Sequence, residues 1–200
     1  MLIFTILSKI KNSGATVVAG TISSGPSASA FIKQARELGL ESLIILDGLS
    51  EYGNWYELSG EAANGVLDAR PIFYNEAGFE FAERFLDKYG YVASCAIEGV
   101  HWDHGNNLID TLRQTLDVYG ELTTESLTEF GKNYVLTGKY EYTNGVTQEC
   151  FKWTPETNPS PVMGEEYFYA SVMQMWDGEM ISIWPENRKN GDFVLPDHLD

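Results

Sequence analysis

The chain has 200 residues, of which 44% are hydrophobic and 13% aromatic, and its formal net charge is −16. This length suits one full domain or parts of two, and the composition supports a packed core. The negative charge argues against nucleic acid and anionic membrane surfaces as partners, because phosphate groups are bound by basic faces. No hydrophobic run is long enough to cross a membrane.

The first expected element is a helix over the N-terminal residues MLIFTILSKIKNS. Phe4, Leu7 and Ile10 fall on one helical face, and Gly14 stands where a C-terminal capping glycine belongs. A secretory signal peptide has its basic residues before the apolar segment, whereas here the lysines follow it and a small-residue cleavage site is lacking. We therefore expect the chain to begin inside or just before a helix.

The segment 14–48 predicts a strand–helix–strand unit. Residues 16–20 and 43–46 are continuous apolar runs, which are typical of buried strands. Between them, Pro26 suits the first turn of a helix and Gly39 its end. Strand, helix and strand in this order imply a parallel pair joined by a right-handed crossover.

Helices and then hairpins are expected downstream. Pro71 restricts the extended segment 65–74 to a sheet edge or a connector. Amphipathic helices are expected over 77–89 and 102–119, a short capped helix from Thr123, and hairpins around Asn144-Gly145 and Asp177-Gly178. The side chains expected to face inward are Phe81, Ala82, Phe85 and Tyr89 on the first of these helices, and Leu108, Ile109, Leu112 and Leu116 on the second.

Polar loops follow both strands of the 14–48 unit. In parallel α/β sheets, ligands bind outside the carboxyl ends of the strands, and a helix N-terminus offers free N–H groups. The candidate ligand-binding residues are therefore Thr21, Ser23, Ser24, Asp47, Gly48, Tyr52 and Trp55, with Trp102 as a further aromatic that could wall a cleft. The alternative is structural: a serine of the first loop caps the helix, and the aromatic side chains pack in a core or hinge.

The sequence His101-Trp102-Asp103-His104 is the best candidate for metal or acid–base chemistry, since two histidines three residues apart can face the same way. A third metal ligand would have to come from elsewhere, such as Glu98. We favour the alternative that Asp103 caps a helix and the histidines lie near solvent. Nucleophile-elbow, phosphate-loop and dinucleotide-binding motifs are lacking. We therefore expect no enzyme, no metal and no cofactor.

The two cysteines, Cys95 before a helix and Cys150 in an expected strand, could pair. We favour the alternative that they act as two small buried apolar side chains. Their spacing does not suggest structural zinc.

The stretch GATVVAGTISSGPSASAFIKQARELGL resembles type I periplasmic solute-binding proteins, in the branch that serves branched-chain amino-acid and related ABC importers. In that family, a buried strand, a polar loop and a helix with a QAR-like triplet precede a Gly-Leu pair. The resemblance continues, in order, through GEAANGV at 60–66, FAERFLDKYG at 81–90, HWDH at 101–104, and QMWDGE at 174–179 followed by Trp184-Pro185. It spans nearly the whole chain.

The resemblance implies an α/β fold with parts of two Rossmann-like lobes, which hinge segments join and which close on a ligand. Residues 1–67 and 171–200 would form part of lobe two, and 68–170 part of lobe one. The first half of the fold, with its Ser/Thr-rich loop for the ligand carboxylate, would be missing. The family places an aromatic or hydroxyl residue where Thr21–Ser24 lie, and an acid near Asp47 for the ligand's ammonium group.

The function implied by the resemblance is that of an extracytoplasmic solute-binding component of an ABC transporter. It would bind an amino acid or a similar small polar, amide-like ligand between the lobes and pass it to the membrane permease, and it would work in the periplasm or outside the cell. The same fold could instead serve as a ligand-sensing module in a receptor or regulator. A lobe without its first strands exposes sheet edges, which favour self-association.

Overall fold

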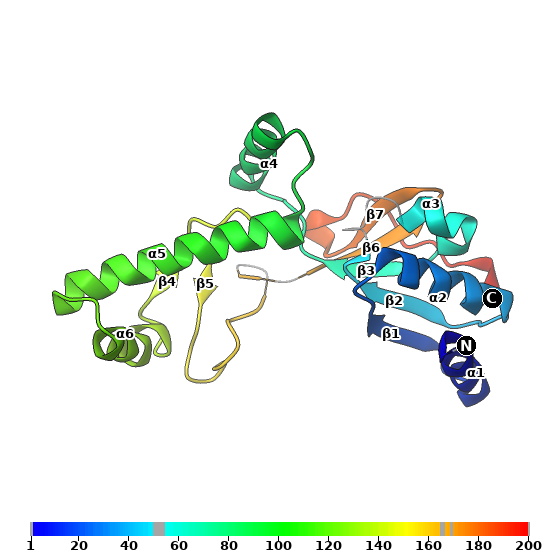
Figure 1. Cartoon of the computed structure of the whole chain (residues 1–200), viewed down its shortest axis with the longest axis horizontal. Helices are drawn as coiled ribbons and strands as arrows, with labels where there is room; N and C mark the ends of the chain where they lie inside the picture. The colour runs from blue at the N-terminus through cyan, green and yellow to red at the C-terminus, as the bar shows by residue number, and fades with distance from the viewer. Residues whose placement is uncertain (1, 50–54, 165–166, 169, 200) are drawn as a thin grey trace. The chain divides into compact units, whose positions relative to one another are not determined.

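The computed structural model describes residues 2–49, 55–164, 167–168 and 170–199. Contacts divide the chain into two compact units (Figure 1). Unit 1 comprises Met1–Arg70 and Ala170–Asp200, and unit 2 comprises Pro71–Tyr169.

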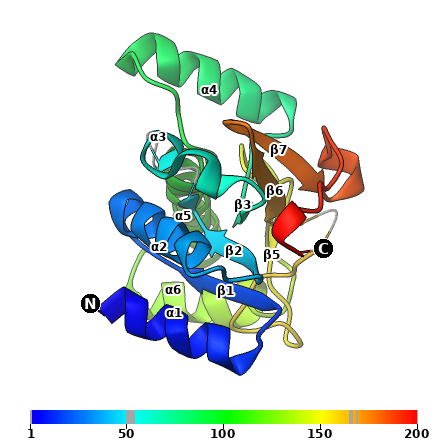
Figure 2. The same ribbon diagram turned by 90° about the vertical axis from the view of Figure 1, so that its right-hand side faces the viewer.

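Unit 1 is built on a five-stranded sheet with the order β1-β2-β3-β6-β7. Its strands are β1 (Val17–Thr21), β2 (Leu43–Asp47), β3 (Leu67–Arg70), β6 (Ser171–Trp176) and β7 (Glu179–Trp184). The first three strands run parallel, as the sequence predicted for β1 and β2, whereas β6 is antiparallel to β3 and β7 to β6. Figure 2 shows the parallel strands side by side across the sheet.

The described part of unit 1 contains the α-helices α1 (Leu2–Ser13), α2 (Gly25–Glu37) and α3 (Trp55–Ser59). Short 3₁₀ helices cover Gly60–Ala63, Glu186–Arg188 and Asp197–Leu199. One core joins α1 and α2 to the sheet, with Leu7, Ile32 and Ile44 fully buried in it. The predicted N-terminal helix is thus confirmed, and Gly14 ends it with a left-handed φ of 68°.

β1 is an edge strand, which corrects the prediction of a buried one. Four of its five residues are exposed, and Val17 keeps 49% of its surface accessible. Val18 packs toward the core, on the side where Ile44 of β2 is buried. A continuous apolar run occurs both in strands that are covered on both faces and in strands with one exposed face. The sequence pattern therefore predicted more burial for β1 than the structure shows.

β3 is a central strand, which corrects the expectation of a sheet edge at 65–74. It lies between β2 and β6, and its Asp68 is buried. Pro71 follows the last strand residue, Arg70, and therefore removes no hydrogen bond from the sheet.

The predicted C-terminal hairpin around Asp177-Gly178 is confirmed as β6 and β7. Asp177 and Gly178 connect the two strands with φ values of 49° and 87°. Positive φ at both positions is what a two-residue turn of the primed type requires.

In its described residues, unit 2 contains the α-helices α4 (Glu76–Tyr89), α5 (Val100–Tyr119) and α6 (Thr124–Phe130), and the π-helical turns Cys95–Gly99 and Gly131–Val135. Strands β4 (Glu141–Tyr142) and β5 (Phe151–Lys152) pair antiparallel. Gly90 and Gly120 end α4 and α5 in the left-handed conformation, and Thr123 forms a capping box at α6. These three predicted helices are confirmed.

The hairpin predicted around Asn144-Gly145 does not form, because a buried carboxylate takes its backbone donors. Asp103, fully buried in α5, accepts the N–H groups of Val146 at 2.7 Å and Thr147 at 2.8 Å, and the Thr147 hydroxyl at 2.5 Å. The strand pairing is consequently limited to the short β4–β5 ladder. Asp103 also does not cap its helix. Gly99 is the N-cap residue of α5 and gives no side-chain cap, while Ser94 caps the preceding π-helical turn, where its Oγ accepts the Ile97 N–H at 3.0 Å.

The apolar faces of α4 and α5 are not the inward faces that their patterns predicted. Tyr89, Leu108, Ile109 and Leu116 are exposed, while Phe81, Ala82, Phe85 and Leu112 are only half-buried. Amphipathic helices bury their apolar stripe against another layer. The part of unit 2 that the structure describes has no sheet beyond β4 and β5 to supply that layer.

Among the described residues, no helix is both long and apolar enough to cross a membrane. Neither cysteine is in a disulfide. Cys95 is buried, as the favoured alternative expected, whereas Cys150 is only half-buried. Cys150 lies in the loop before β5 and not in a strand.

Replacing Asp103 with Ala should destabilise the protein by about 3 kcal/mol, because three donors would lose a buried, charged acceptor. Urea unfolding followed by circular dichroism measures the effect. Asp117→Ala, an exposed carboxylate on the same helix, should change the free energy of unfolding by less than about 0.5 kcal/mol. Equal effects of the two substitutions would contradict the role of Asp103.

The stabilising contribution of Asp103 should also depend on pH. Burial raises the pKa of its carboxyl, and the hydrogen bonds from Thr147 and Val146 oppose this only in part. A raised folded-state pKa means that the contribution is fully present below the unfolded value of about 3.9 and is lost as the pH rises through the folded-state pKa. The difference in unfolding free energy between wild type and Asp103→Asn should therefore fall with rising pH above about 3.9. A difference that increases would show that hydrogen bonding outweighs burial.

Candidate functional site

The carboxyl ends of β1 and β2 lie side by side in unit 1. Thr21 and Asp47 are the last register pair of these strands, and Asp47 is in turn paired with Ala69 of β3. Both side chains are exposed, and Thr21 Oγ1 donates to Asp47 Oδ2 over 3.5 Å. Such a long hydrogen bond is weak, so a stronger ligand donor can take its place on the carboxylate.

The loop after β1 leads directly into the N-terminus of α2. Ser24 is the N-cap residue, and its hydroxyl accepts the N–H of Ser27 at 3.5 Å. Pro26 occupies the first turn, as predicted. Ser24 therefore takes the structural role that the sequence left open, while Ser23 is exposed on the same loop.

Gly48 follows Asp47 with a φ of 73°, in the left-handed region that glycine tolerates best. The next residue, Leu49, donates its N–H to the Asp68 carboxylate at 3.2 Å. The sequence analysis did not identify Asp68 as a residue that holds the loop after β2. The pattern that could have indicated it is a single acidic residue within the apolar start of β3.

Trp55 does not wall a cleft, because only 3% of its surface is exposed and it packs in the core of unit 1. Its carbonyl oxygen accepts the hydroxyls of Ser29 at 3.1 Å and Ser59 at 2.7 Å. This residue therefore anchors the start of α3 to α2. Tyr52 lies outside the described residues.

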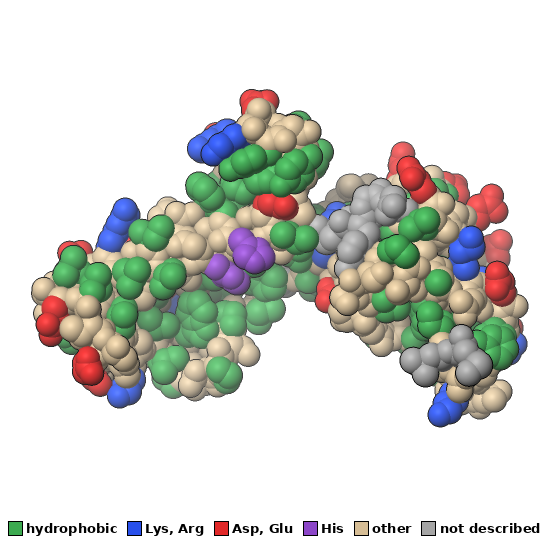
Figure 3. All heavy atoms as spheres, in the orientation of Figure 1, with side chains coloured by type: hydrophobic (Ala, Val, Ile, Leu, Met, Phe, Trp, Pro, Cys, Tyr) green, Lys and Arg blue, Asp and Glu red, His purple; other side chains and the backbone are tan. Residues whose placement is uncertain are grey.

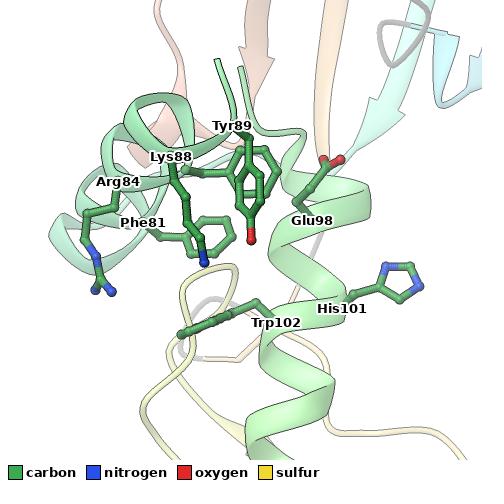
Figure 4. A pocket seen from close by; sticks show the side chains of 8 residues that line it. Phe81, Arg84, Lys88, Tyr89, Glu98, His101 and Trp102 are labelled. Atoms are coloured by element: carbon green, nitrogen blue, oxygen red, sulfur yellow. The ribbon is translucent and has the colours of Figure 1, made fainter. Parts of the chain in front are cut away.

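Unit 2 holds a separate cavity of about 500 Å³ between α4 and α5 (Figure 4). The ring centroids of Trp102 and Phe81 are 5.4 Å apart across it, and Lys88 Nζ lies 5.0 Å from the centroid of the Tyr89 ring. The complete lining is Phe81, Arg84, Phe85, Lys88, Tyr89, Glu98, His101 and Trp102. Trp102 is thus in a different unit from the other candidates.

The histidine cluster shows no metal-site geometry. His101 and His104 are exposed, as the favoured alternative expected, and His101 Nδ1 contacts the Ile97 carbonyl at 2.6 Å. Glu98, the proposed third ligand, accepts the Ser94 N–H at 2.8 Å. Across the described part of the chain, no three His, Cys, Asp or Glu side chains come together as a metal-binding group.

Comparison with known proteins finds similarity only among solved structures. No protein-family model and no curated protein matches the chain. A putative branched-chain amino acid ABC transporter protein from Silicibacter pomeroyi matches with a TM-score of 0.73 and 15% identity, over 97% of this chain and 50% of the other. A leucine-binding protein from Thermotoga maritima matches with a TM-score of 0.58 and 18% identity, over 88% and 46%. An extracellular ligand-binding receptor from Rhodopseudomonas palustris matches with a TM-score of 0.63 and 18% identity, over 89% and 50%.

The chain has a type I periplasmic-binding fold. It spans about half the length of the solved chains that it matches. The fold class inferred from the sequence, a mixed α/β chain representing part of this fold, is thereby confirmed.

Replacing Ser24 with Ala should lower the free energy of unfolding by about 1 kcal/mol, because α2 would lose its N-cap acceptor. Ser23→Ala, one residue away, should cost less than about 0.5 kcal/mol. Thermal and urea unfolding of the two variants separate capping from any role in binding. If Ser23→Ala proved the more destabilising variant, the capping assignment would be wrong.

Proposed function

We propose that the chain is part of an extracytoplasmic solute-binding protein of an ABC importer and that it binds an amino acid or a similar small polar ligand. The fold shared with binding proteins of such transporters supports this proposal. The observation that carries it is the exposed polar edge of unit 1, by which we mean the carboxyl ends of β1 and β2. There, Thr21 and Asp47 end adjacent parallel strands beside a helix N-terminus. In open α/β sheets, this edge is where ligands bind.

The chemistry of the edge suits a zwitterion. Asp47 supplies an exposed carboxylate for the ligand's ammonium group. Thr21 and Ser23 supply hydroxyls, and the N-terminus of α2 favours negative charge, so that together they suit the ligand's carboxylate. Hydrogen bonds to charged groups contribute about 1.5–3 kcal/mol each. Gly48 has no side chain to restrict the approach of a ligand to the backbone.

Residues 1–67 and 171–200 are assigned to lobe two of the fold, and residues 68–170 to lobe one. The division of the chain after Arg70 and before Ala170 supports this assignment. In the proposed mechanism, the ligand binds between the lobes and favours their closed arrangement, because only that arrangement gives it contacts from both sides. The closed protein then delivers the ligand to the permease outside the cytoplasmic membrane.

A sensing role is the second candidate, favoured by the similarity to an extracellular ligand-binding receptor. Uptake of labelled amino acid by cells that lack the gene distinguishes the two. Lost uptake supports the importer component, whereas unchanged uptake by a protein that still binds the amino acid supports the sensor.

Replacing Asp47 with Asn should weaken amino-acid binding at least about tenfold, because the ammonium group loses its charged acceptor. Amide chemical-shift titrations by NMR, extended to millimolar leucine and a panel of other amino acids, detect weak binding and locate it. The largest shifts are expected at residues 21–24 and 47–48.

The matched control is Glu41→Gln, which removes an exposed carboxylate just before the opposite end of β2. It should leave the affinity unchanged. Wild-type affinity in the Asp47→Asn variant would remove Asp47 from the site, and shifts confined to other residues would refute the proposed edge.

A further inference from the structure

The basic side chains of α4 stand beside its aromatic face. Phe81, Phe85 and Tyr89 follow one another at intervals of four residues and therefore share one side of the helix. Arg84 and Lys88, the basic residues of α4, flank this side. Figure 3 shows hydrophobic side chains gathered on the side of α4 toward α5, with basic side chains next to them. The acidic residues of α4 are exposed on another face: Glu76, Glu80, Glu83 and Asp87. The helix thus keeps its negative charges away from the aromatic side.

Close packing around Phe73 holds the start of α4 against the start of α5. The centroids of the Phe73 and Phe81 rings are 5.7 Å apart. A Cβ atom added to Gly78 of α4 would lie 2.6 Å from the Val146 carbonyl oxygen. One added to Gly99, just before α5, would lie 2.8 Å from a ring carbon of Phe73. Because only glycine allows so close an approach, the two helices that wall the cavity are positioned by packing within unit 2.

The cavity between α4 and α5 has the size and lining of a small-molecule site. Its volume of about 500 Å³ lies within the range of about 300–1,000 Å³ that is typical of ligand pockets. The ring planes of Phe81 and Trp102 are inclined by 43°, and those of Phe85 and Tyr89 by 45°. Tilted rings present edges as well as faces, and both are surfaces against which a further aromatic ring packs. Trp102 remains 46% exposed and is accessible to a ligand.

The lining of this cavity has an excess of positive charge. Figure 4 shows the Lys88 side chain extending between the Phe81 and Tyr89 rings. Within the described residues, neither Lys88 nor Arg84 forms an ion pair. Glu98, the acidic residue of the lining, already accepts a backbone N–H at 2.8 Å. A cationic ligand would meet two like charges here, whereas an anion would pair with them.

We propose that this cavity is a second binding site, separate from the polar edge of unit 1, and that it takes a small aromatic carboxylate. The ring of the ligand packs against Phe81 and Trp102. Its carboxylate accepts a hydrogen bond from Lys88, and Arg84 adds to the attraction. A free ammonium group on the ligand disfavours binding here, so the site discriminates against the amino acids proposed for the edge of unit 1.

NMR titration of the full chain with four matched probes tests this chemistry. Phenylpropionate should shift the indole N–H of Trp102 and the backbone amides of residues 81–89. Phenylpropionamide has the same ring without the charge and should bind at least about fivefold more weakly, and the cation phenylpropylamine more weakly still. Octanoate has the carboxylate without the ring and should also bind at least about fivefold more weakly than phenylpropionate.

Replacing Lys88 with Gln tests the charge contact directly. It should weaken phenylpropionate binding at least about fivefold and leave phenylpropionamide binding unchanged, because only the acid pairs with the ammonium group. The matched control is Lys139→Gln, which should change neither affinity. Lys139 is also an exposed lysine of unit 2, and its Nζ lies 5.9 Å from the centroid of the Tyr134 ring, but it does not line the cavity.

Several results would overturn the inference. Equal affinities for the acid and the amide, or equal effects of the two lysine substitutions, would contradict recognition of an anion. Octanoate binding as tight as that of phenylpropionate would contradict recognition of an aromatic ring. Shifts confined to residues 21–24 and 47–48 would place the ligand at the edge of unit 1, and no shifts at millimolar phenylpropionate would show that the cavity takes no such ligand. Amino-acid binding is measured at the resonances of unit 1, so failure at the cavity leaves the solute-binding proposal to its own test.

Discussion

The in-register parallel pairing of β1, β2 and β3 is the constraint on which the candidate site depends. Because the strands run in the same direction and their last residues are paired, the loops that follow β1 and β2 must leave the sheet at the same edge. A shift of one residue between β1 and β2 would place Thr21 and Asp47 on opposite faces of the sheet. Ile44 and Leu46 fix that register, since only one face of β2 can bury them against the helices.

Two buried carboxylates organise the loops by the same physical means. Asp68 accepts the Leu49 N–H in unit 1, and Asp103 accepts the N–H groups of Val146 and Thr147 in unit 2, together with the Thr147 hydroxyl. A buried carboxylate needs donors to offset its lost hydration, and a loop needs acceptors for N–H groups that no ladder satisfies. The N–H groups of the loop satisfy the carboxylate, and the carboxylate satisfies the N–H groups. A buried acid within an apolar segment can therefore fix the path of a distant loop.

The sequence predicted the helices and their ends well, but it did not predict contacts between residues that lie far apart in the chain. Glycine and proline positions placed the ends of α2, α4 and α5 correctly, because capping is decided within a few residues. The Asn144-Gly145 turn failed because Asp103, more than 40 residues earlier, binds the same backbone. Trp55 was assigned to a cleft because an aromatic residue after a polar loop gives the same sequence pattern whether its side chain faces a ligand or the core. The edge position of β1 could not be predicted from its own residues either, because it depends on which other strands pair with it.

In the proposed binding protein, the exposed apolar surfaces would link the stability of each unit to ligand binding. Fully burying one large apolar side chain stabilises a structure by about 1.5–3 kcal/mol. Trp102, Ile109 and Leu116 of α5 are each already about half covered, so covering the rest of all three would contribute several kcal/mol, a large share of the net stability of a typical domain. The proposed lobe closure would require each lobe to move as a rigid body, because part of the ligand's binding free energy would otherwise go into ordering the lobe itself. In the proposed binding protein, cover over α4 and α5 would therefore act on ligand affinity without touching the ligand. The loops at Thr21 and Asp47 depend less on such cover, because α2 and β2 already pack them onto a closed core in unit 1.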